Sequence, residues 1–242
     1  MINFKNQKFY YDPYPHALFK DVFDAKFYSQ LCSDFPDDME FERHDYDKEN
    51  NLKQKKFILN ENNIFFKEII NKKESLKKIY NFLCDQKFKE DIFDLLEKNS
   101  IRLQKHNTQG VLRKILNKIK NIKNFGFEFS MISTDGGFIR PHTDGSNKLI
   151  SFVIPIVENK SIENVPNSGT NILKSTEDRY KYNFLNSTVP FESTEIVRKI
   201  PFNGNQIFFF IKTHNSLHSV GPMKNLNGET FMRKSINFFI YK

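Results

Sequence analysis

The sequence has no tryptophan, only two cysteines and no long hydrophobic run. Cys32 and Cys84 form neither a zinc motif nor a disulfide framework, which suits a reducing compartment. The longest purely apolar run, residues 207–211, has five residues, far fewer than a membrane span needs. The first ten residues lack the apolar core of a signal peptide. We therefore expect a soluble, cytoplasmic protein with no membrane partner.

Glycine and proline are also scarce, at nine each, which excludes collagen-like and low-complexity chains. Phenylalanine is abundant instead, with 27 residues, so the 242-residue chain can build a real core. The net charge is +8, from 37 basic and 29 acidic residues. This balance permits an anionic substrate or a nucleic-acid partner. The basic residues are scattered, however, which favours a solvated lysine-rich surface.

The first half of the chain has mainly helical periodicity. Asp24 is placed to cap a helix over residues 24–35. Amphipathic patterns predict further helices over residues 63–83 and 88–96. A short strand is expected over residues 17–23 and a charged loop over residues 37–56.

Residues 111–125 combine an apolar stripe with a basic remainder. A basic amphipathic helix of this kind can bind membranes or nucleic acid. Most such stripes face the core of their own protein, and we favour that interpretation.

From residue 127 onward the pattern changes to short β-rich runs separated by turns such as Asp135-Gly136-Gly137. This succession of short strands and turns, after a helical first part, predicts an α+β, mainly β protein whose core is a sandwich, jelly roll or barrel. We expect one domain over residues 1–242, with residues 1–126 as a mainly helical support region and 127–242 as the β core. The expected strands cover residues 127–133, 138–144, 149–156, 170–173, 194–200, 206–211, 218–221 and 233–241.

A potential metal site begins with His142 and Asp144. Residues at positions i and i+2 of a strand point to the same face, so the imidazole and the carboxylate lie side by side. His218, after the apolar run at 207–211, offers a third ligand, and His214 is its rival. Two histidines and one carboxylate form the facial triad of non-heme Fe(II) oxygenases.

The last predicted strand has two different faces. Arg233, Ser235, Asn237 and Phe239 lie on one face, and the other carries Lys234 and three apolar residues. The first face suits the inside of a barrel that holds a site. There the Arg233 guanidinium could bind a carboxylate through two hydrogen bonds, with the Ser235 hydroxyl beside it.

Together these motifs resemble the Fe(II)/2-oxoglutarate-dependent dioxygenases, and within them the prolyl-4-hydroxylase-like branch. The resemblance implies a double-stranded β-helix core covered by the N-terminal helices. It implies iron binding by His142, Asp144 and His218, and binding of the far carboxylate of 2-oxoglutarate by Arg233 and Ser235. Fe(II), 2-oxoglutarate and O2 are the implied cofactor and co-substrates, with succinate and CO2 as co-products. The presence of Asp144 favours hydroxylation over halogenation.

The sequence departs from the family pattern in two places. Residues 127–133 lack the tyrosine that often contacts 2-oxoglutarate in relatives, and Ser130 or Ser133 are the nearest substitutes. Residues 157–193 are long and polar, and a substrate lid would fall there. Four polar lid residues favour an anionic substrate: Lys174, Arg179, Tyr180 and Lys181.

The leading hypothesis is a hydroxylase of a protein side chain, a sugar or another small metabolite. An alkylated nucleic-acid repair dioxygenase is the alternative, but the usual second arginine after Arg233 is absent and nucleic acid is not the expected partner. A non-catalytic cupin-like binding protein and a cupin-like zinc enzyme are further alternatives. His16, His44 and His106 are expected to be surface or capping residues, and Phe208–Phe210 to be core.

Overall fold

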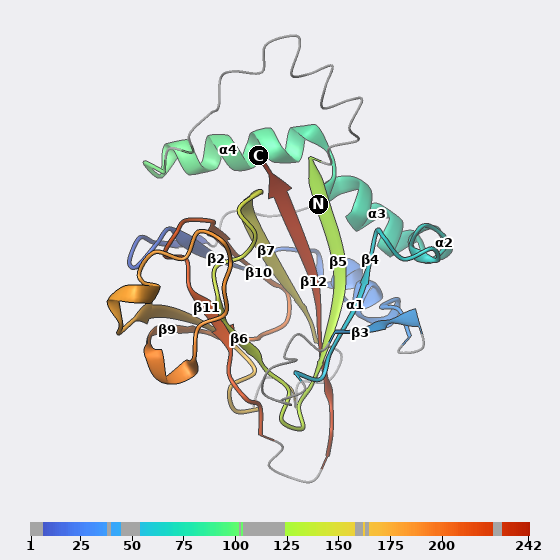
Figure 1. Cartoon of the computed structure of the whole chain (residues 1–242). Coiled ribbons are helices and arrows are strands. Elements are labelled where there is room, and N and C mark those ends of the chain that lie inside the picture. Colours follow the sequence, from blue (N-terminus) through green and yellow to red (C-terminus); the bar gives the residue numbers. More distant parts are fainter. Residues whose placement is uncertain are drawn as a thin grey trace.

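The computed structural model of the chain contains two antiparallel β-sheets and a layer of helices (Figure 1). It describes residues 7–37, 40–44, 54–101, 103, 124–157, 162, 165–224 and 229–242. The helices are α1 (Ala25–Ser33), α2 (Phe66–Lys72), α3 (Glu74–Leu83) and α4 (Gln86–Lys98), with short 3-10 turns η3 (Asp178–Tyr180) and η4 (Phe191–Ser193). The strands are β1 (Gln7–Tyr10), β2 (His16–Lys20), β3 (Glu42–His44), β4 (Lys56–Asn60), β5 (Phe125–Ser133), β6 (Ile139–His142), β7 (Lys148–Ile156), β8 (Thr170–Ser175), β9 (Thr194–Ile200), β10 (Gln206–Ile211), β11 (His218–Val220) and β12 (Met232–Tyr241).

The two sheets share the last eight strands equally. The large sheet has the order β1-β2-β10-β7-β12-β5-β4-β3, and the small sheet has the order β6-β11-β8-β9. From β5 to β12, consecutive strands alternate between the two sheets, except that β8 and β9 both belong to the small sheet. This is the double-stranded β-helix arrangement of a jelly roll. The predicted fold class is confirmed.

The helices cover the outer face of the large sheet, away from the small sheet (Figure 1). Side chains alternate along a strand, so β12 sends Ile236, Phe238 and Ile240 to this face, where all three are fully buried. They belong to one core cluster with helix residues such as Leu76 and Ile92. A fully buried side chain of this size contributes about 1.5–3 kcal/mol, so this layer supplies much of the stability of the fold.

The predicted helices and strands lie close to the observed ones. The Asp24 carboxylate accepts hydrogen bonds from the Lys26 and Phe27 backbone amides and caps α1, as expected. All eight strands expected from residue 127 onward are present, and their ends match the prediction or differ from it by one or two residues. Residues 111–123 of the predicted basic helix lie outside the described residues.

Three features of the first half were not predicted. The segment 37–56, expected to be a loop, contains β3, and β4 starts at its end. Both strands extend the large sheet beyond β5, and β1 extends it at the opposite edge beyond β2. His16 was expected at the surface but is fully buried in β2, where its ring stacks on Tyr10. The first 126 residues therefore add strands as well as helices.

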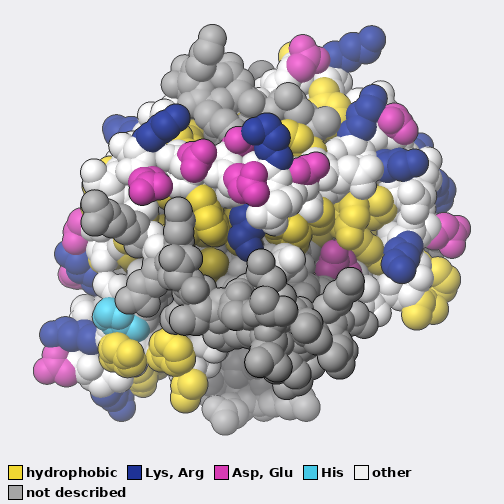
Figure 2. Space-filling model, turned by 90° about the horizontal axis from the view of Figure 1, so that it is seen from above, with side chains coloured by type: hydrophobic (Ala, Val, Ile, Leu, Met, Phe, Trp, Pro, Cys, Tyr) yellow, Lys and Arg dark blue, Asp and Glu magenta, His cyan; other side chains and the backbone are white. Residues whose placement is uncertain are grey.

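The surface above α4 carries charges of both signs. Figure 2 shows basic and acidic side chains interspersed across the described part of this face, without a large patch of one sign. Among the described residues, no helix is long and apolar enough to cross a bilayer.

Candidate metal centre

His142, Asp144 and His218 come together between the two sheets. His142 ends β6, and its register partner on β11 is His218. Asp144 follows β6 in a left-handed backbone conformation, with φ of 70°. Asp tolerates this region better than most residues, and here the turn brings its side chain back beside His142. The turn closes with a hydrogen bond from the Lys148 amide to the Gly145 carbonyl, and β7 begins.

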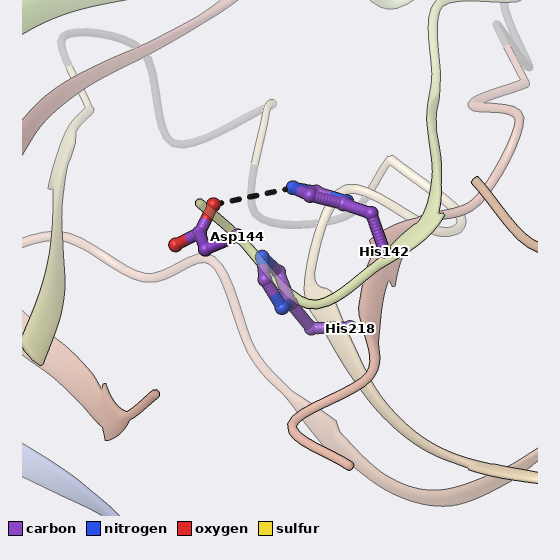
Figure 3. Close-up of side chains that lie close together, drawn as sticks. All are labelled: His142, Asp144 and His218. Carbon is purple, nitrogen blue, oxygen red and sulfur yellow. Dashed lines mark ion pairs between the residues drawn. The ribbon is translucent and has the colours of Figure 1, made fainter. Parts of the chain in front are cut away.

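The three side chains point toward a common centre (Figure 3). One potential ligand atom from each residue lies within 4.8 Å of the others. The Nδ1 atom of His142 is 2.9 Å from the Arg140 carbonyl, and Nδ1 of His218 is 3.0 Å from the Ser216 carbonyl. A carbonyl accepts only, so Nδ1 carries the proton in both rings and Nε2 keeps its lone pair for a ligand.

The Asp144 carboxylate is held at both oxygens. Oδ2 accepts a hydrogen bond from the Ser151 hydroxyl at 2.6 Å. Oδ1 lies 3.2 Å from the Lys148 ammonium and 3.4 Å from Nε2 of His142. Burial alone raises the pKa of Asp144, but Lys148 and the two histidines outweigh it and hold that pKa well below its usual range. Asp144 is thus ionised at neutral pH.

Burial has the opposite consequence for His218. Burial, with a smaller contribution from the neighbouring His142, lowers the pKa of this imidazole to about 3. The ring is therefore neutral, as metal coordination requires. Two imidazoles, each with Nδ1 on a backbone carbonyl and Nε2 toward the centre, and one carboxylate fit Fe(II). His142, Asp144 and His218 would hold the ion.

Arg233 lines the same cavity, which has a volume of about 500 Å³. Its side chain is buried, its Nε donates to the Ser168 carbonyl at 2.6 Å, and its guanidinium carbon lies 4.0 Å from the centre of the Phe202 ring. Burial lowers the pKa of Arg233 to about 9, which still leaves a cation at neutral pH. Within the described part of the chain, no acidic side chain pairs with it.

The other predicted residues are placed as follows. Ser235 is buried, but it is not part of the cavity wall, and its hydroxyl donates to the Asn237 side-chain oxygen at 3.2 Å. Its register partner Ser130 does line the cavity, as does Thr170. His214, the rival ligand, stacks on Tyr182 outside the metal cluster.

The described part of the segment 157–193 contributes Thr170, Asn186 and Thr188 to the cavity. Its charged residues face elsewhere. Lys174 pairs with Asp12, Arg179 with Glu177 and Lys181 with Asp178. None of these three cations lines the cavity, so an anionic substrate has to be argued from other residues.

Two contacts of Asp144 were not anticipated from the sequence. Lys148 lies four residues after Asp144, and Ser151 lies seven residues after it. Only the tight turn after β6 brings both into reach. Arg140, two residues before His142 and also lining the cavity, could have been found by the same i, i+2 rule that paired His142 with Asp144.

No protein-family model matches the sequence, and no curated protein matches it either. Several solved structures are similar in fold. A prolyl-4-hydroxylase from Pseudomonas putida is 13% identical, with a TM-score of 0.44 over 94% of this chain and 92% of its own. A 2OG-Fe(II) oxygenase family oxidoreductase from Burkholderia pseudomallei is 12% identical, with a TM-score of 0.47 over 93% and 84%. A prolyl hydroxylase from Trichoplax adhaerens, in complex with a hypoxia inducible factor peptide, is 9% identical, with a TM-score of 0.47 over 93% and 83%.

Proposed function

We propose that the chain is an Fe(II)- and 2-oxoglutarate-dependent dioxygenase that hydroxylates its substrate. The observation that carries this proposal is the pairing of two features in one cavity: the His142–Asp144–His218 cluster and the buried Arg233. A buried guanidinium without an acidic partner is unfavourable unless a ligand supplies the negative charge. The five-carbon dicarboxylate 2-oxoglutarate offers one end to the iron and the other to Arg233.

Each residue has a distinct task in this function. His142 and His218 present Nε2, because backbone carbonyls hold their Nδ1 protons. Asp144 presents Oδ1, which lies beside Nε2 of His142, while Ser151 holds Oδ2. Arg233 presents its terminal nitrogens, because Ser168 and the Phe202 ring fix the side chain. Iron with 2-oxoglutarate and O2 would supply the oxidising chemistry, and the chain orients the reactants and excludes water.

The test is thermal unfolding under nitrogen, with Mn(II) as a redox-inert substitute for Fe(II). A ligand at 100 times its dissociation constant adds about 2.7 kcal/mol of stability, or roughly 5–10 °C for a chain of this size. We expect Mn(II) to raise Tm in the wild type and 2-oxoglutarate to raise it further. His142→Ala should lose both shifts, whereas Arg233→Ala should keep the first and lose the second. Succinate formation from 2-oxoglutarate in air, with Fe(II), is the matching activity readout.

The alternatives give different results in the same experiment. A cupin-like zinc enzyme would be stabilised by metal but not by 2-oxoglutarate. A non-catalytic binding protein would show neither shift and no succinate under any condition. A nucleic-acid repair enzyme would show both shifts, and its binding to DNA would weaken steeply with salt.

A further inference from the structure

Three lysines gather at neighbouring strand ends close to Asp144, and one of them, Lys148, lines the cavity. Lys148 begins β7 and lines the cavity. The Lys212 amide donates to the Leu149 carbonyl at 2.9 Å, and the Lys242 amide donates to the Asn147 carbonyl at 3.0 Å. The two lysines therefore flank Lys148, at the ends of the neighbouring strands β10 and β12. We call Lys148, Lys212 and Lys242 the basic end.

Among the described residues, the cavity wall carries more basic than acidic side chains. Its cations are Lys56, Arg140, Lys148 and Arg233, and its acidic residues are Glu128 and Asp144. Lys56 and Glu128 face each other at 3.4 Å. Bound Fe(II) and dianionic 2-oxoglutarate would cancel each other, so they would leave the basic character of this lining unchanged.

The lysines of the basic end add to the positive charge beside the cavity. Among the described residues, neither Lys212 nor Lys242 has an acidic side chain in ion-pair contact. Burial, together with the charges of Lys242 and Lys148, lowers the pKa of Lys212 to about 8, and Asp144 acts in the other direction. This concentration of lysines favours a negatively charged ligand.

Lys148 is placed to make the direct contact. Its ammonium lies 3.2 Å from Asp144 Oδ1 and 3.5 Å from the centre of the Phe239 ring. An ammonium has three donor hydrogens, so this pairing leaves donors for a ligand. Asn186 and Thr188 line the same cavity and add neutral polar groups.

We propose that the substrate carries an oxyanion, a carboxylate or a phosphate, and that Lys148 binds this group beside the metal ligands. This inference rests on the proposed function, since it assigns the substrate class of that same cavity. The lid cations Lys174, Arg179 and Lys181 take no part, because acidic neighbours neutralise them.

The experiment uses full-length protein saturated with Mn(II) and 2-oxoglutarate under nitrogen. Two probes are added in separate arms: inorganic phosphate, followed by 31P relaxation, and 13C-labelled acetate, followed by 13C relaxation. Mn(II) accelerates the relaxation of nuclei that bind close to it. We expect at least one probe to be relaxed in the wild type, and Lys148→Gln to weaken its binding about tenfold, the lower end for a charge-assisted hydrogen bond. Lys148→Arg should restore most of it. Lys174→Gln, which removes an exposed lysine paired with Asp12, is the matched control and should change nothing.

The outcomes separate the two proposals. If Mn(II) or 2-oxoglutarate does not bind the wild type, as water proton relaxation and 2-oxoglutarate titration report, the proposed function fails. If both bind and neither probe is relaxed, the oxyanion inference is overturned and the function stands. Equal relaxation in wild type and Lys148→Gln also overturns it, because the probe then contacts the metal without Lys148. Relaxation of phosphate alone or acetate alone identifies the oxyanion.

Discussion

The two faces of β12 serve two different parts of the molecule, the helix-covered core and the cavity. Its outward side chains Ile236, Phe238 and Ile240 are fully buried against helices. Its inward side chains Arg233, Asn237 and Phe239 line the cavity. The same backbone thus stabilises the fold on one face and positions ligands on the other. Stability and binding should therefore respond to mutation separately, although the residues alternate one by one.

A cavity on the helix-facing side of β12 should cause the greatest loss of stability. Phe238→Ala removes a fully buried ring that contacts Phe88, Phe125 and Phe152, and should cost about 4 kcal/mol of the free energy of unfolding. Mn(II) affinity of the folded protein should stay unchanged. Chemical denaturation and Mn(II) titration measure the two quantities. The matched control is Phe239→Ala, one residue on, which is only half-buried and should cost less than half as much. Equal losses in the two variants would contradict the division between faces.

The same alternation explains why β12 was predictable from the sequence. Ten residues with a period of two fix which side faces the helices, and the direction of Arg233 follows from it. β3 and β4 carry no such signal. They have three and five residues, and pairing with β5 and with each other makes them strands. His16 was misjudged for a similar reason, because only the pairing of β2 with both β1 and β10 buries it.

The metal cluster was predictable in part. His142 and Asp144 are neighbours by spacing, and His218 follows a recognisable apolar strand. The contacts that orient them were not predictable, since they depend on the turn at residues 143–147 and on the register of β7. Period-two reasoning places Ser235 on the inner face of β12, where it is buried and donates to Asn237, a residue of the cavity wall. Its role toward 2-oxoglutarate stays a prediction.

On the cavity side of β12, Arg233 should affect ligand binding rather than stability. Arg233→Met should weaken 2-oxoglutarate binding about 100-fold, because the far carboxylate loses a buried cationic partner. The free energy of unfolding without ligand should not fall, since Met removes an unpaired buried charge while keeping much of the packing. Isothermal titration of the Mn(II)-loaded protein measures the affinity. Lys234→Met, on the opposite face, is the control and should leave 2-oxoglutarate affinity unchanged. A loss of stability as large as that of Phe238→Ala would show that Arg233 is a structural residue.

The smallest of the three effects concerns a residue that touches no ligand directly. Ser151 donates to Asp144 Oδ2 at 2.6 Å and so leaves Oδ1 turned toward His142. Removing such an outer partner typically weakens metal binding 10- to 100-fold. Lys148 still pairs with Asp144 in Ser151→Ala, so we expect the lower value, about tenfold, with little change in stability. The free Mn(II) signal in electron paramagnetic resonance measures the affinity. Ser130→Ala removes another buried, cavity-lining hydroxyl that has no contact with Asp144, and it should bind Mn(II) like the wild type. If the two serine variants bind Mn(II) equally well, Lys148 and the turn alone position the carboxylate, and the inner face of β7 contributes only to the shape of the cavity.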